Sequence, residues 1–388
     1  MSRLAELIQQ YCPDGVEYKK LGEITTILRG KRLTKSQLSN DKPFAVYHGG
    51  LEPLGYYESA NRTANTTMII NVGASAGTIG YSKVDFWSSD GCYCIEHSAS
   101  FDDRYIYYIL QTQEKQLKSK VRVAGIPTLD RLAVEDLLVP IPPLPVQEEI
   151  VRILDSFAEL QAELQAELQK RSQQYNYYRD NLFSFAGRTD VEWKRLGDVA
   201  SIKTGRRFVR TDIKESGVPC FHYGDIYTYY GLTATTTKGY LDAELASKLR
   251  FAQPNDVVVV CAGENDMDIG VGVAWLGKEP AVAHDACCIL HHNQNPRYIS
   301  HFLRTHNYHL QIRRYVKNGK ISSLPASGLA EAIIPIPSLE EQERIATVLD
   351  RFDALTTDLT AGLPAEIEAR RKQYEYYRDQ LLTFKHKA

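Results

Sequence analysis

The stretch Gln147-Glu-Glu-Ile-Val-Arg-Ile-Leu-Asp155 returns in the second half of the chain as Gln342-Glu-Arg-Ile-Ala-Thr-Val-Leu-Asp350. Other anchors recur around it in the same order: residues 16–24 as 191–199, residues 139–142 as 334–337, and residues 175–182 as 374–381. Repeats that keep their order indicate duplication of one structural unit. The sequence therefore predicts two copies of one unit in a chain of 388 residues, which is long enough for each copy to have its own core.

The two halves diverge between these anchors. Residues 16–139 and 191–334 mix short apolar runs, such as Met68-Ile-Ile and Val257-Val-Val-Val260, with Gly, Pro and Asn turn signals. This pattern predicts strand-rich domains with a few helices, which we expect at residues 104–120 and 296–317. Each domain ends at a Pro-x-Pro exit, which cannot continue a helix or a central strand. A shared framework with different intervening residues suits two domains that recognise two different targets.

A long helix is predicted after each exit. Apolar residues fall mostly three or four apart from Ile150 to Phe185 and from Ile345 to Phe384, which is typical of a coiled-coil seam. From Gln147 to Phe185 such a helix would extend about 58 Å at about 1.5 Å per residue, too far to bury against one small domain. We expect the two stripes to pack on each other as an antiparallel pair. The alternative is two unrelated surface helices, each packed on its own domain.

The first of these helices contains a tetrapeptide repeat, Gln161-Ala-Glu-Leu164 followed by Gln165-Ala-Glu-Leu168. Each repeat adds about 6 Å of helix, which is commensurate with one or two base pairs of DNA at about 3.4 Å each. The same residue types are simply strong helix formers, and both interpretations hold together. In the second helix, Gly362-Leu-Pro364 is expected to break or kink the chain.

The predicted fold class is α+β. Two homologous strand-rich domains are separated by two long helices packed as an antiparallel coiled coil, with pseudo-two-fold symmetry. The Pro-x-Pro exits and the repeated anchors set the expected boundaries: residues 1–143 for the first domain, 144–187 for the first helix, 188–338 for the second domain, and 339–388 for the second helix, broken near Pro364.

The charge is unevenly spread along a chain whose net charge is −2. Residues 191–334 carry 17 Lys and Arg against 14 Asp and Glu, and residues 16–139 carry 15 against 14, whereas the helical segments are net negative. A protein that binds nucleic acid alone usually has a distinctly basic domain. We therefore expect this chain to touch DNA with help from a partner that supplies further phosphate contacts.

Composition also bears on location. No run of about 18 or more apolar residues is present, and the start, Met1-Ser-Arg-Leu-Ala-Glu-Leu-Ile, is too polar for a signal peptide. The seven cysteines, including the adjacent Cys287 and Cys288, fit free thiols better than a disulfide framework. These features predict a cytoplasmic protein.

Motifs that would indicate an enzyme are incomplete. Residues 272–279 approach a phosphate-binding loop, but Glu279 stands where Ser or Thr would hold Mg²⁺, and the interior is typical of a strand. Asn295-Pro296-Arg-Tyr298 lacks the second proline of an amino-methyltransferase motif and is expected to open a helix, with Asn295 as its cap. Cys92-x-Cys94 does not have the usual zinc spacing, so we favour buried thiols and predict no metal site and no catalytic residues.

The repeated Val-Glu-aromatic anchor, the Pro-x-Pro exits, Gln-x-x-Ile-x-x-x-Leu-Asp and Gln-Tyr-x-Tyr-Tyr-Arg-Asp-x-Leu together resemble the specificity subunit of type I restriction–modification enzymes. The resemblance covers the whole chain in order, and the Ala-Glu-Leu element resembles the type IC branch. It implies two target-recognition domains, each reading one half of a bipartite site in double-stranded DNA. It also implies helices that set the spacer and dock two methyltransferase subunits, with restriction subunits joining later. S-adenosylmethionine, ATP and Mg²⁺ are then expected on the partner subunits and no cofactor on this chain.

Candidate DNA-contacting residues are sought in turns, since readout needs Arg, Lys, Asn or Gln side chains that reach base edges and phosphates. The turn after the shared first strand is basic in both halves, a polar aromatic turn follows it, and a Gly/Ser-rich turn and a basic turn lie further along. The predicted DNA-binding residues are Arg29, Lys31, Arg32, Tyr47, His48, Ser75, Thr78, Arg206, Arg207, Arg210, His222, Tyr223, Lys317, Lys320 and Ser322. For each of them the alternative is an ordinary solvated loop side chain.

The helices carry more tyrosines than one seam needs. Aromatic side chains are common interface anchors. The predicted partner-binding residues are Tyr177, Tyr178, Tyr376 and Tyr377. Packing within the seam and against the domains is the alternative.

Two other classes of protein remain as alternatives. A scaffold could use the duplicated domains to bind something other than DNA, although the divergence between shared anchors counts against it. An autonomous DNA methyltransferase is disfavoured because its motifs are missing. The sequence therefore favours a DNA-binding specificity subunit without catalysis of its own.

Overall fold

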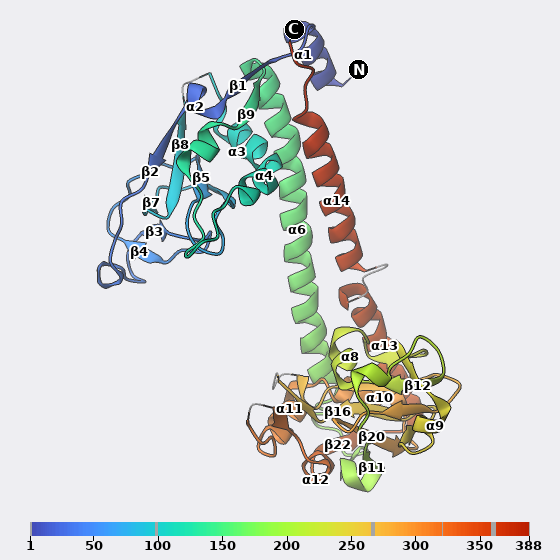
Figure 1. Ribbon diagram of the computed structural model, residues 1–388. Coiled ribbons are helices and arrows are strands. Elements are labelled where there is room, and N and C mark those ends of the chain that lie inside the picture. The colour runs from blue at the N-terminus through green and yellow to red at the C-terminus, as the bar shows by residue number, and fades with distance from the viewer. Residues whose placement is uncertain (1, 98–99, 265–267, 320, 358–361, 388) are drawn as a thin grey trace. The chain divides into compact units, whose positions relative to one another are not determined.

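The computed structural model describes residues 2–97, 100–264, 268–319, 321–357 and 362–387 (Figure 1). The chain divides into two compact units. The first unit comprises residues 1–163 and 367–388, and the second comprises residues 164–366. Both divisions fall within helical segments, so each unit contains one strand-rich globular domain together with parts of the long helices.

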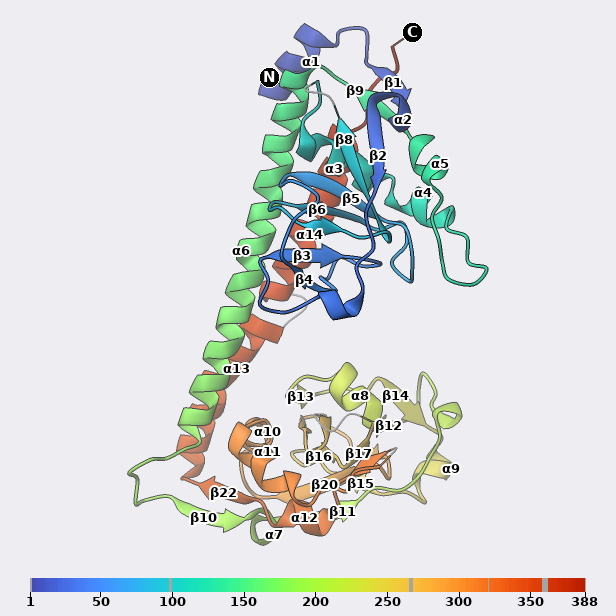
Figure 2. The same cartoon turned by 90° about the vertical axis from the view of Figure 1, so that its left-hand side faces the viewer.

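The first globular domain is built on two sheets (Figure 2). An antiparallel four-stranded sheet has the order β2 (Thr25–Arg29), β8 (Cys92–His97), β5 (Thr66–Ile70), β6 (Ile79–Ser82). A three-stranded sheet has the order β4 (Gly55–Tyr57), β3 (Phe44–Tyr47), β7 (Trp87–Ser88). The entry strand β1 (Glu17–Lys20) pairs with the exit strand β9 (Leu138–Ile141). The helices of this domain are α1 (Arg3–Tyr11), α2 (Leu21–Ile24), η1 (Lys35–Gln37), α3 (Asp103–Thr112), α4 (Glu114–Ser119) and α5 (Arg131–Glu135).

The second globular domain has the same plan with additions. Its larger sheet has the order β11 (Ala200–Thr204), β20 (Cys287–His292), β16 (Val257–Val260), β18 (Gly272–Trp275), β13 (Thr233–Ala234). Its smaller sheet has the order β14 (Gly239–Leu241), β12 (Val218–Phe221), β19 (Ala281–Ala283), β15 (Phe251–Ala252). Two short pairs complete it: β10 (Glu192–Arg195) with β22 (Ile333–Ile336), and β17 (Ala262–Gly263) with β21 (Ser322–Ser323). Its helices are α7 (Leu196–Val199), η2 (Arg210–Asp212), α8 (Tyr223–Thr228), α9 (Ala243–Ala246), α10 (Pro296–Phe302), α11 (His306–Arg313) and α12 (Ala326–Ala330).

The strand registers confirm that the two domains are homologous and α+β. Glu192 pairs with Ile336 in the second domain as Glu17 pairs with Ile141 in the first. The parallel pairs also correspond, since β3 lies beside β7 and β12 lies beside β19. The additional strands β13 and β15 and the helices α8 and α9 all fall between β11 and β19. The divergence seen in the sequence is therefore concentrated in one stretch of a shared framework.

The predicted single helices over residues 104–120 and 296–317 are each divided. The first is split at Gln113, which separates α3 from α4. The second ends at Phe302, and Thr305 then caps α11 by accepting a hydrogen bond from the Tyr308 backbone N–H at 3.3 Å. The predicted start of the second helix is confirmed, because the Asn295 side chain caps α10 and Pro296 occupies its first turn.

The long helical segments are α6 (Leu144–Leu182), α13 (Leu339–Thr357) and α14 (Leu363–Leu381). α6 is continuous through the Gln-Ala-Glu-Leu repeats. In the second segment α13 ends at Thr357 and α14 begins at Leu363, and residues 358–361 lie outside the described residues. Pro364 lies in the first turn of α14, where its missing N–H breaks no helical hydrogen bond. Among the described residues, no helix has the length and apolar character needed to cross a bilayer.

Helices from the two repeats pair within each unit. In the first unit the rings of Phe157 on α6 and Tyr377 on α14 stack with centroids 5.6 Å apart. In the second unit Phe352 on α13 packs against Tyr175 and Tyr178 of α6, at 6.5 and 5.6 Å. The alternative of two unrelated surface helices is therefore wrong for these segments.

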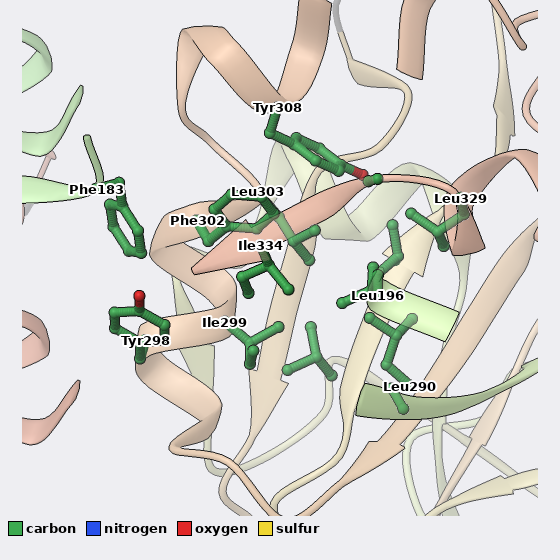
Figure 3. Close-up of a cluster of buried hydrophobic side chains, with 14 of the residues drawn as sticks. Phe183, Leu196, Leu290, Tyr298, Ile299, Phe302, Leu303, Tyr308, Leu329 and Ile334 are labelled. Atoms are coloured by element: carbon green, nitrogen blue, oxygen red, sulfur yellow. The ribbon is translucent and has the colours of Figure 1, made fainter. Parts of the chain in front are cut away.

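Each globular core is completed by the helix end that belongs, in sequence, to the other repeat. The core of the second unit includes Phe183 from the end of α6, which packs on Tyr298 and Phe302 at 4.7 and 5.7 Å (Figure 3). The core of the first unit includes Leu382, and the Tyr18 hydroxyl donates to the Phe384 carbonyl at 3.1 Å. Both domains therefore depend on residues distant in sequence to cover their apolar surface.

Candidate nucleic-acid interface

Three turns of the second domain lie side by side and hold most of its predicted DNA-binding residues. The turn after β11 is fixed by the Gly205 N–H, which donates to the Cys287 carbonyl at 2.8 Å, and by the Arg206 N–H, which donates to Ala283 at 3.1 Å. The His284 N–H donates to the Phe221 carbonyl at 3.1 Å, which joins the turn before β20 to the turn after β12. Backbone hydrogen bonds thus place these turns against one another.

The turns enclose a cleft of about 490 Å³. Its lining combines two arginines, two carboxylates, two histidines and aromatic side chains, and it includes the edge of β17 and Ile321 from a later hairpin. The lining residues are Arg207, Phe208, Val209, Arg210, His222, Tyr223, Ala262, Gly263, Glu264, His284, Asp285, Ala286 and Ile321. Four of the predicted DNA-binding residues, Arg207, Arg210, His222 and Tyr223, are therefore brought to one place.

Two histidine rings pack against each other at a tilt in the wall of this cleft. The ring of His222 lies 4.9 Å from that of His284 and 4.6 Å from that of Tyr223. Burial, the His284 charge and the Arg210 charge, in that order, lower the pKa of His222, whose Nδ1 accepts from the Gly224 N–H at 3.3 Å and so starts α8. Burial also lowers the pKa of His284, whose Nε2 lies 3.0 Å from the Phe208 carbonyl and donates to it. Both pKa shifts favour the neutral rings, so the positive charges of the cleft are those of Arg207 and Arg210, which line it together with the carboxylates of Glu264 and Asp285.

The arginines differ in how they are held. Arg206 is exposed and its Nη1 donates to the Lys248 carbonyl at 2.7 Å. Arg207 and Arg210 are exposed at the cleft, and their charges contribute to lowering the pKa of His284 and His222 respectively. Exposed guanidinium groups beside a cleft are suited to phosphate oxygens and to the O6 and N7 acceptors of guanine.

The first domain repeats the arrangement. The Gly30 N–H donates to Cys92 at 3.3 Å, and the Lys31 N–H donates to the carbonyl of Ser88 at 3.0 Å. His48 Nδ1 lies 3.2 Å from the Ser89 hydroxyl and 3.3 Å from a carboxylate oxygen of Asp90. The exposed basic group is Arg29, Lys31 and Arg32, with Arg29 Nε donating to the Asp90 carbonyl at 3.0 Å and Tyr47 half-buried edge-on to Phe86. The predicted residues of this turn cluster are brought together as they are in the second domain.

Glycine is required where the basic turn crosses the adjacent strand. A Cβ on Gly30 would lie 2.1 Å from the Ser88 carbonyl oxygen. A Cβ on Gly205 would lie 2.2 Å from the carbonyl oxygen of His284. Both contacts are far inside van der Waals distance, so the close approach that carries the basic residues depends on these two equivalent glycines.

The remaining predicted residues are placed differently. Ser75 and Thr78 are half-buried in a turn closed by the Thr78 N–H donating to the Ser75 carbonyl at 3.0 Å, and Gly77 within this turn lies against Lys118 of α4. Ser322 is buried in β21, so its side chain does not face solvent and we do not carry it into the interface. Lys317 is exposed, and Lys320 lies outside the described residues.

Sequence reasoning missed part of the cleft. His284, Asp285 and Ile321 line it but were not among the predicted residues. A signal for the first two existed, because Asp90-x-Cys92 and Asp285-x-Cys287 match in the two halves and each precedes a shared strand. Ile321 carried no signal of this kind, since an apolar residue in a loop is ordinarily read as part of the core.

The four predicted partner-binding tyrosines fall into two pairs. Tyr178 and Tyr377 pack on Phe352 and Phe157 of the paired helices. Tyr177 and Tyr376 are more exposed and each contacts the neighbouring tyrosine edge-on. One tyrosine of each pair thus serves the helix pairing, while the other faces solvent.

No group of metal ligands is found in the part of the chain that the structure describes. All seven cysteines are buried and free, which confirms the expectation of buried thiols. The segment resembling a phosphate loop forms strand β18, as its apolar interior predicts.

Comparison with known proteins agrees with this architecture. A model of the type I restriction modification DNA specificity domain matches residues 13–171 and again residues 189–369. The type I restriction enzyme EcoR124I/EcoR124II specificity subunit of Escherichia coli is 34% identical over 62% of this chain, and the match covers 60% of that relative, less than two thirds of its length. A protein named as a type I restriction enzyme specificity subunit of Haemophilus influenzae is 29% identical, covering 95% of this chain and 96% of that relative.

Two solved structures share the fold. The type I restriction–modification S subunit from M. genitalium superposes with a TM-score of 0.57 at 15% identity, covering 95% of both chains. A chain from a structure titled for complex assembly and conformational transition of the type I R-M system superposes with a TM-score of 0.62 at 16% identity, covering 95% of this chain and 98% of that one. Because the family model matches both halves and most of the length, the chain belongs to the family of type I restriction–modification DNA specificity proteins.

Proposed function

We propose that this chain is the non-catalytic specificity subunit of a type I restriction–modification complex and that each globular domain reads one half of a bipartite DNA site. The observation that carries the proposal is the pair of equivalent turn clusters. Both present an exposed basic turn on the same backbone framework, while the side chains around that framework differ. One framework with two sets of side chains suits an asymmetric site in two parts.

The helices and the charge support the remaining parts of the proposal. The uninterrupted α6 acts as a spacer between the DNA-reading domains, and Tyr177 and Tyr376 help to dock two methyltransferase subunits, with restriction subunits joining the assembly. Each domain has only a small positive charge, so tight DNA binding requires the partners' phosphate contacts. In this scheme the partner subunits hold S-adenosylmethionine, ATP and Mg²⁺, and the complex works in the cytoplasm.

Selection from random duplexes tests the proposal. The chain is incubated with a pool of randomised DNA, with and without its methyltransferase partner, and the bound DNA is sequenced. Enrichment of one bipartite motif in the presence of the partner is the expected result. No enrichment would instead favour a scaffold, and methylation of DNA by the isolated chain would show that it is an enzyme.

The basic turn of the second domain provides a sharper test. Replacing Arg206 and Arg207 with Ala should weaken binding of the complex to its selected duplex. The slope of log K against log salt should also become shallower, by an amount equivalent to up to about two phosphate contacts. The matched control removes Arg188 and Arg195, which pair with acidic residues and do not line the cleft. Unchanged affinity and unchanged salt slope in the Arg206/Arg207 variant would exclude this turn from the interface.

A further inference from the structure

A short hairpin recurs in the two globular domains, in residues 121–129 and in residues 316–319 with 321–324, Lys320 lying outside the described residues. In the first, Arg122 and Thr128 exchange backbone hydrogen bonds of 2.9 and 3.0 Å. In the second, Lys317 and Ser323 exchange bonds of 2.8 and 3.0 Å. The two hairpins therefore have the same length and the same closing pair, with a basic residue on the first strand of each.

The hairpins are docked at equivalent places beside the turn clusters. In the first domain the Gly73 N–H donates to the Pro127 carbonyl at 2.9 Å, and Thr128 pairs with Val72. In the second domain Ser323 pairs with Ala262, and Ser322 pairs with Gly263. The second strand of each hairpin thus pairs with the segment at residues 72–73 or 262–263, which lies next to the turn cluster of its domain.

Contacts at this edge reach the predicted DNA-binding residues. In the second domain Ile321, at the end of the hairpin, lines the cleft together with Arg207 and Arg210. In the first domain a Cβ on Gly91 would lie 2.6 Å from Val72 Cγ1 and 2.7 Å from His48 Nδ1, so the strand edge and the His48 turn meet there. The hairpin is therefore part of the same surface as the basic turn in both domains.

The hairpins expose apolar side chains at this surface. Val123 is 78% exposed and Ile126 is 71% exposed, and Ile321 in the second domain is 62% exposed. The apolar residues that end the two hairpins, Leu129 and Leu324, are buried. Large apolar side chains gathered at a basic surface indicate a contact that the isolated chain does not make.

When the two hairpins are aligned, one exposed position is identical in both and another differs. Isoleucine is shared, at 126 and 321, whereas the position three residues earlier is Val123 in one domain and Asn318 in the other. In the major groove of DNA, an isoleucine side chain can make an apolar contact with base edges. A valine suits the thymine methyl group, and an asparagine suits the N6 and N7 groups of adenine. The shared residue fits what two half-sites have in common, and the differing residue fits what distinguishes them.

We infer that both hairpins enter the major groove of the DNA, where Ile126 and Ile321 make a shared apolar contact with the bases and Val123 and Asn318 contribute to the choice of base in each half-site. This inference rests on the proposed function and adds a reading element to it. Val123 and Asn318 are then specificity-determining residues, and the basic turn supplies the phosphate contacts.

The first experiment removes the shared side chains in the complete methyltransferase complex. Ile126→Ala and Ile321→Ala should each weaken binding to the selected duplex by about tenfold, because an apolar contact is lost. The salt slope should stay unchanged, since no counterion release depends on these residues. Leu132→Ala and Ile333→Ala are matched controls, being exposed apolar residues outside the hairpins.

The second experiment exchanges the differing residues. In selection from random duplexes, Asn318→Val should lower the preference for adenine at one position of one half-site, and Val123→Asn should lower the preference for thymine in the other. Both residues are exposed, so neither change should alter thermal unfolding, which is measured alongside.

The outcomes distinguish the hairpin from the proposed function. A wild-type complex that selects no bipartite motif would overturn the proposed function itself. A wild-type complex that selects one, with the same affinity and the same motif in all four hairpin variants, would leave that function standing and overturn the role of the hairpins. If only the isoleucine variants lose affinity, and the Val123→Asn and Asn318→Val complexes select the same motif as the wild type, then Val123 and Asn318 do not contribute to the choice of base.

Discussion

Single residues at the turn clusters act through the backbone as much as through their side chains. Gly30 and Gly205 occupy equivalent positions where a turn crosses a neighbouring strand, and neither has space for a Cβ. The adjacent basic side chains reach the surface only because this crossing is tight. Glycine at these positions is thus a requirement of the interface, although it offers no group to DNA.

Gly205→Ala should therefore destabilise the second domain and weaken DNA binding together. The new methyl group overlaps the Ala283 and His284 carbonyl oxygens, and relieving such overpacking costs about 1–3 kcal/mol. Urea unfolding of the chain and titration of the complex with its selected duplex measure the two effects. Gly231→Ala, at a glycine with open space around it, should change neither by more than about 0.5 kcal/mol.

At this scale the sequence predicts residues whose role follows from local pattern. Arg206 and Arg207 follow a recognisable strand and a glycine, so their turn could be placed without a structure. His284 and Ile321 reach the same cleft from segments far along the chain. Their proximity depends on strand pairing between distant segments, which no local pattern encodes.

Among the elements, a half-buried ionic contact joins each globular domain to its long helix. Arg104 on α3 binds Asp155 on α6 and lies over the Tyr108 ring, and the Tyr108 hydroxyl donates to the same carboxylate. In the second unit Arg297 on α10 binds Asp350 on α13. His301, buried between the helices, donates from Nε2 to Asp350 at 2.8 Å. The two repeats therefore use an arginine and an aspartate at matching places, with a tyrosine or a histidine as third member.

Asp350→Asn tests this contact. The hydrogen bonds of His301 and Arg297 hold the pKa of Asp350 below its ordinary value, although burial opposes them. Loss of the charge should lower the free energy of unfolding by about 1–3 kcal/mol, measured by urea denaturation. The exposed pair Lys214–Asp242 supplies the control, and Asp242→Asn should cost less than about 1 kcal/mol. Equal effects of the two changes would contradict a structural role for the half-buried Arg297–Asp350 pair.

The tetrapeptide repeats make a prediction about helix length. Inserting one further Gln-Ala-Glu-Leu unit after Leu168 lengthens α6 by about 6 Å. If α6 is the spacer, the selected motif should gain one or two unspecified base pairs between its halves while the halves themselves are unchanged. Gln165→Lys alters the same segment without changing its length and should leave the motif spacing as it is. A constant spacing after the insertion would rule out α6 as the element that sets it.

The sequence predicts helices correctly where the apolar periodicity extends over many residues, and predicts their bounds wrongly where it extends over few. The continuous helix through the repeats follows from an apolar stripe and strong helix formers. The shorter helices at residues 104–120 and 296–317 are divided, the first at Gln113. In the second, Thr305 caps a new helix and the chain turns to bury Tyr308. Burial in a three-dimensional core overrides local propensity at these points.

For the whole molecule, the histidines make the second unit sensitive to acid. Burial is the first cause that lowers the pKa of each of the five affected side chains: His222, His284, His292, His301 and His309. A group whose pKa is lower in the folded protein stabilises the fold above its unfolded value, about 6.5 for histidine, and loses that contribution as the pH falls. The second unit is therefore most stable at neutral pH or above.

Thermal unfolding between pH 7.5 and pH 5.5 checks this expectation. The melting temperature should fall as the pH is lowered, because the unfolded chain takes up protons that the buried rings exclude. His301→Gln should melt lower than the wild type at pH 7.5 but lose less on acidification. A melting temperature that is independent of pH across this range would contradict the assignment of neutral buried histidines.

At the same scale, the duplication and the order of the domains are evident from the sequence. The packing of each long helix's end against the globular domain of the other repeat is not. The recurrence of residues 175–182 as 374–381 predicts two helices with an apolar face. The sequence does not decide which globular domain packs against each of these faces. The contact of Tyr18 with Phe384, and of Phe183 with Tyr298, is decided by how complete domains pack. The pseudo-two-fold arrangement of the whole stays a prediction.

Because each core is completed by a helix end from the other repeat, the two cores become complete in a fixed order as the chain is synthesised. The core of the second unit is made of residues between Tyr175 and Phe352, so it can close while the ribosome is still adding the last helix. The core of the first unit includes Leu382, with Tyr374 and Leu381 packed against it, and these residues emerge only after the second unit has been made. Domains usually fold in the order in which they are made. Here the domain that is translated first is the one that is finished last.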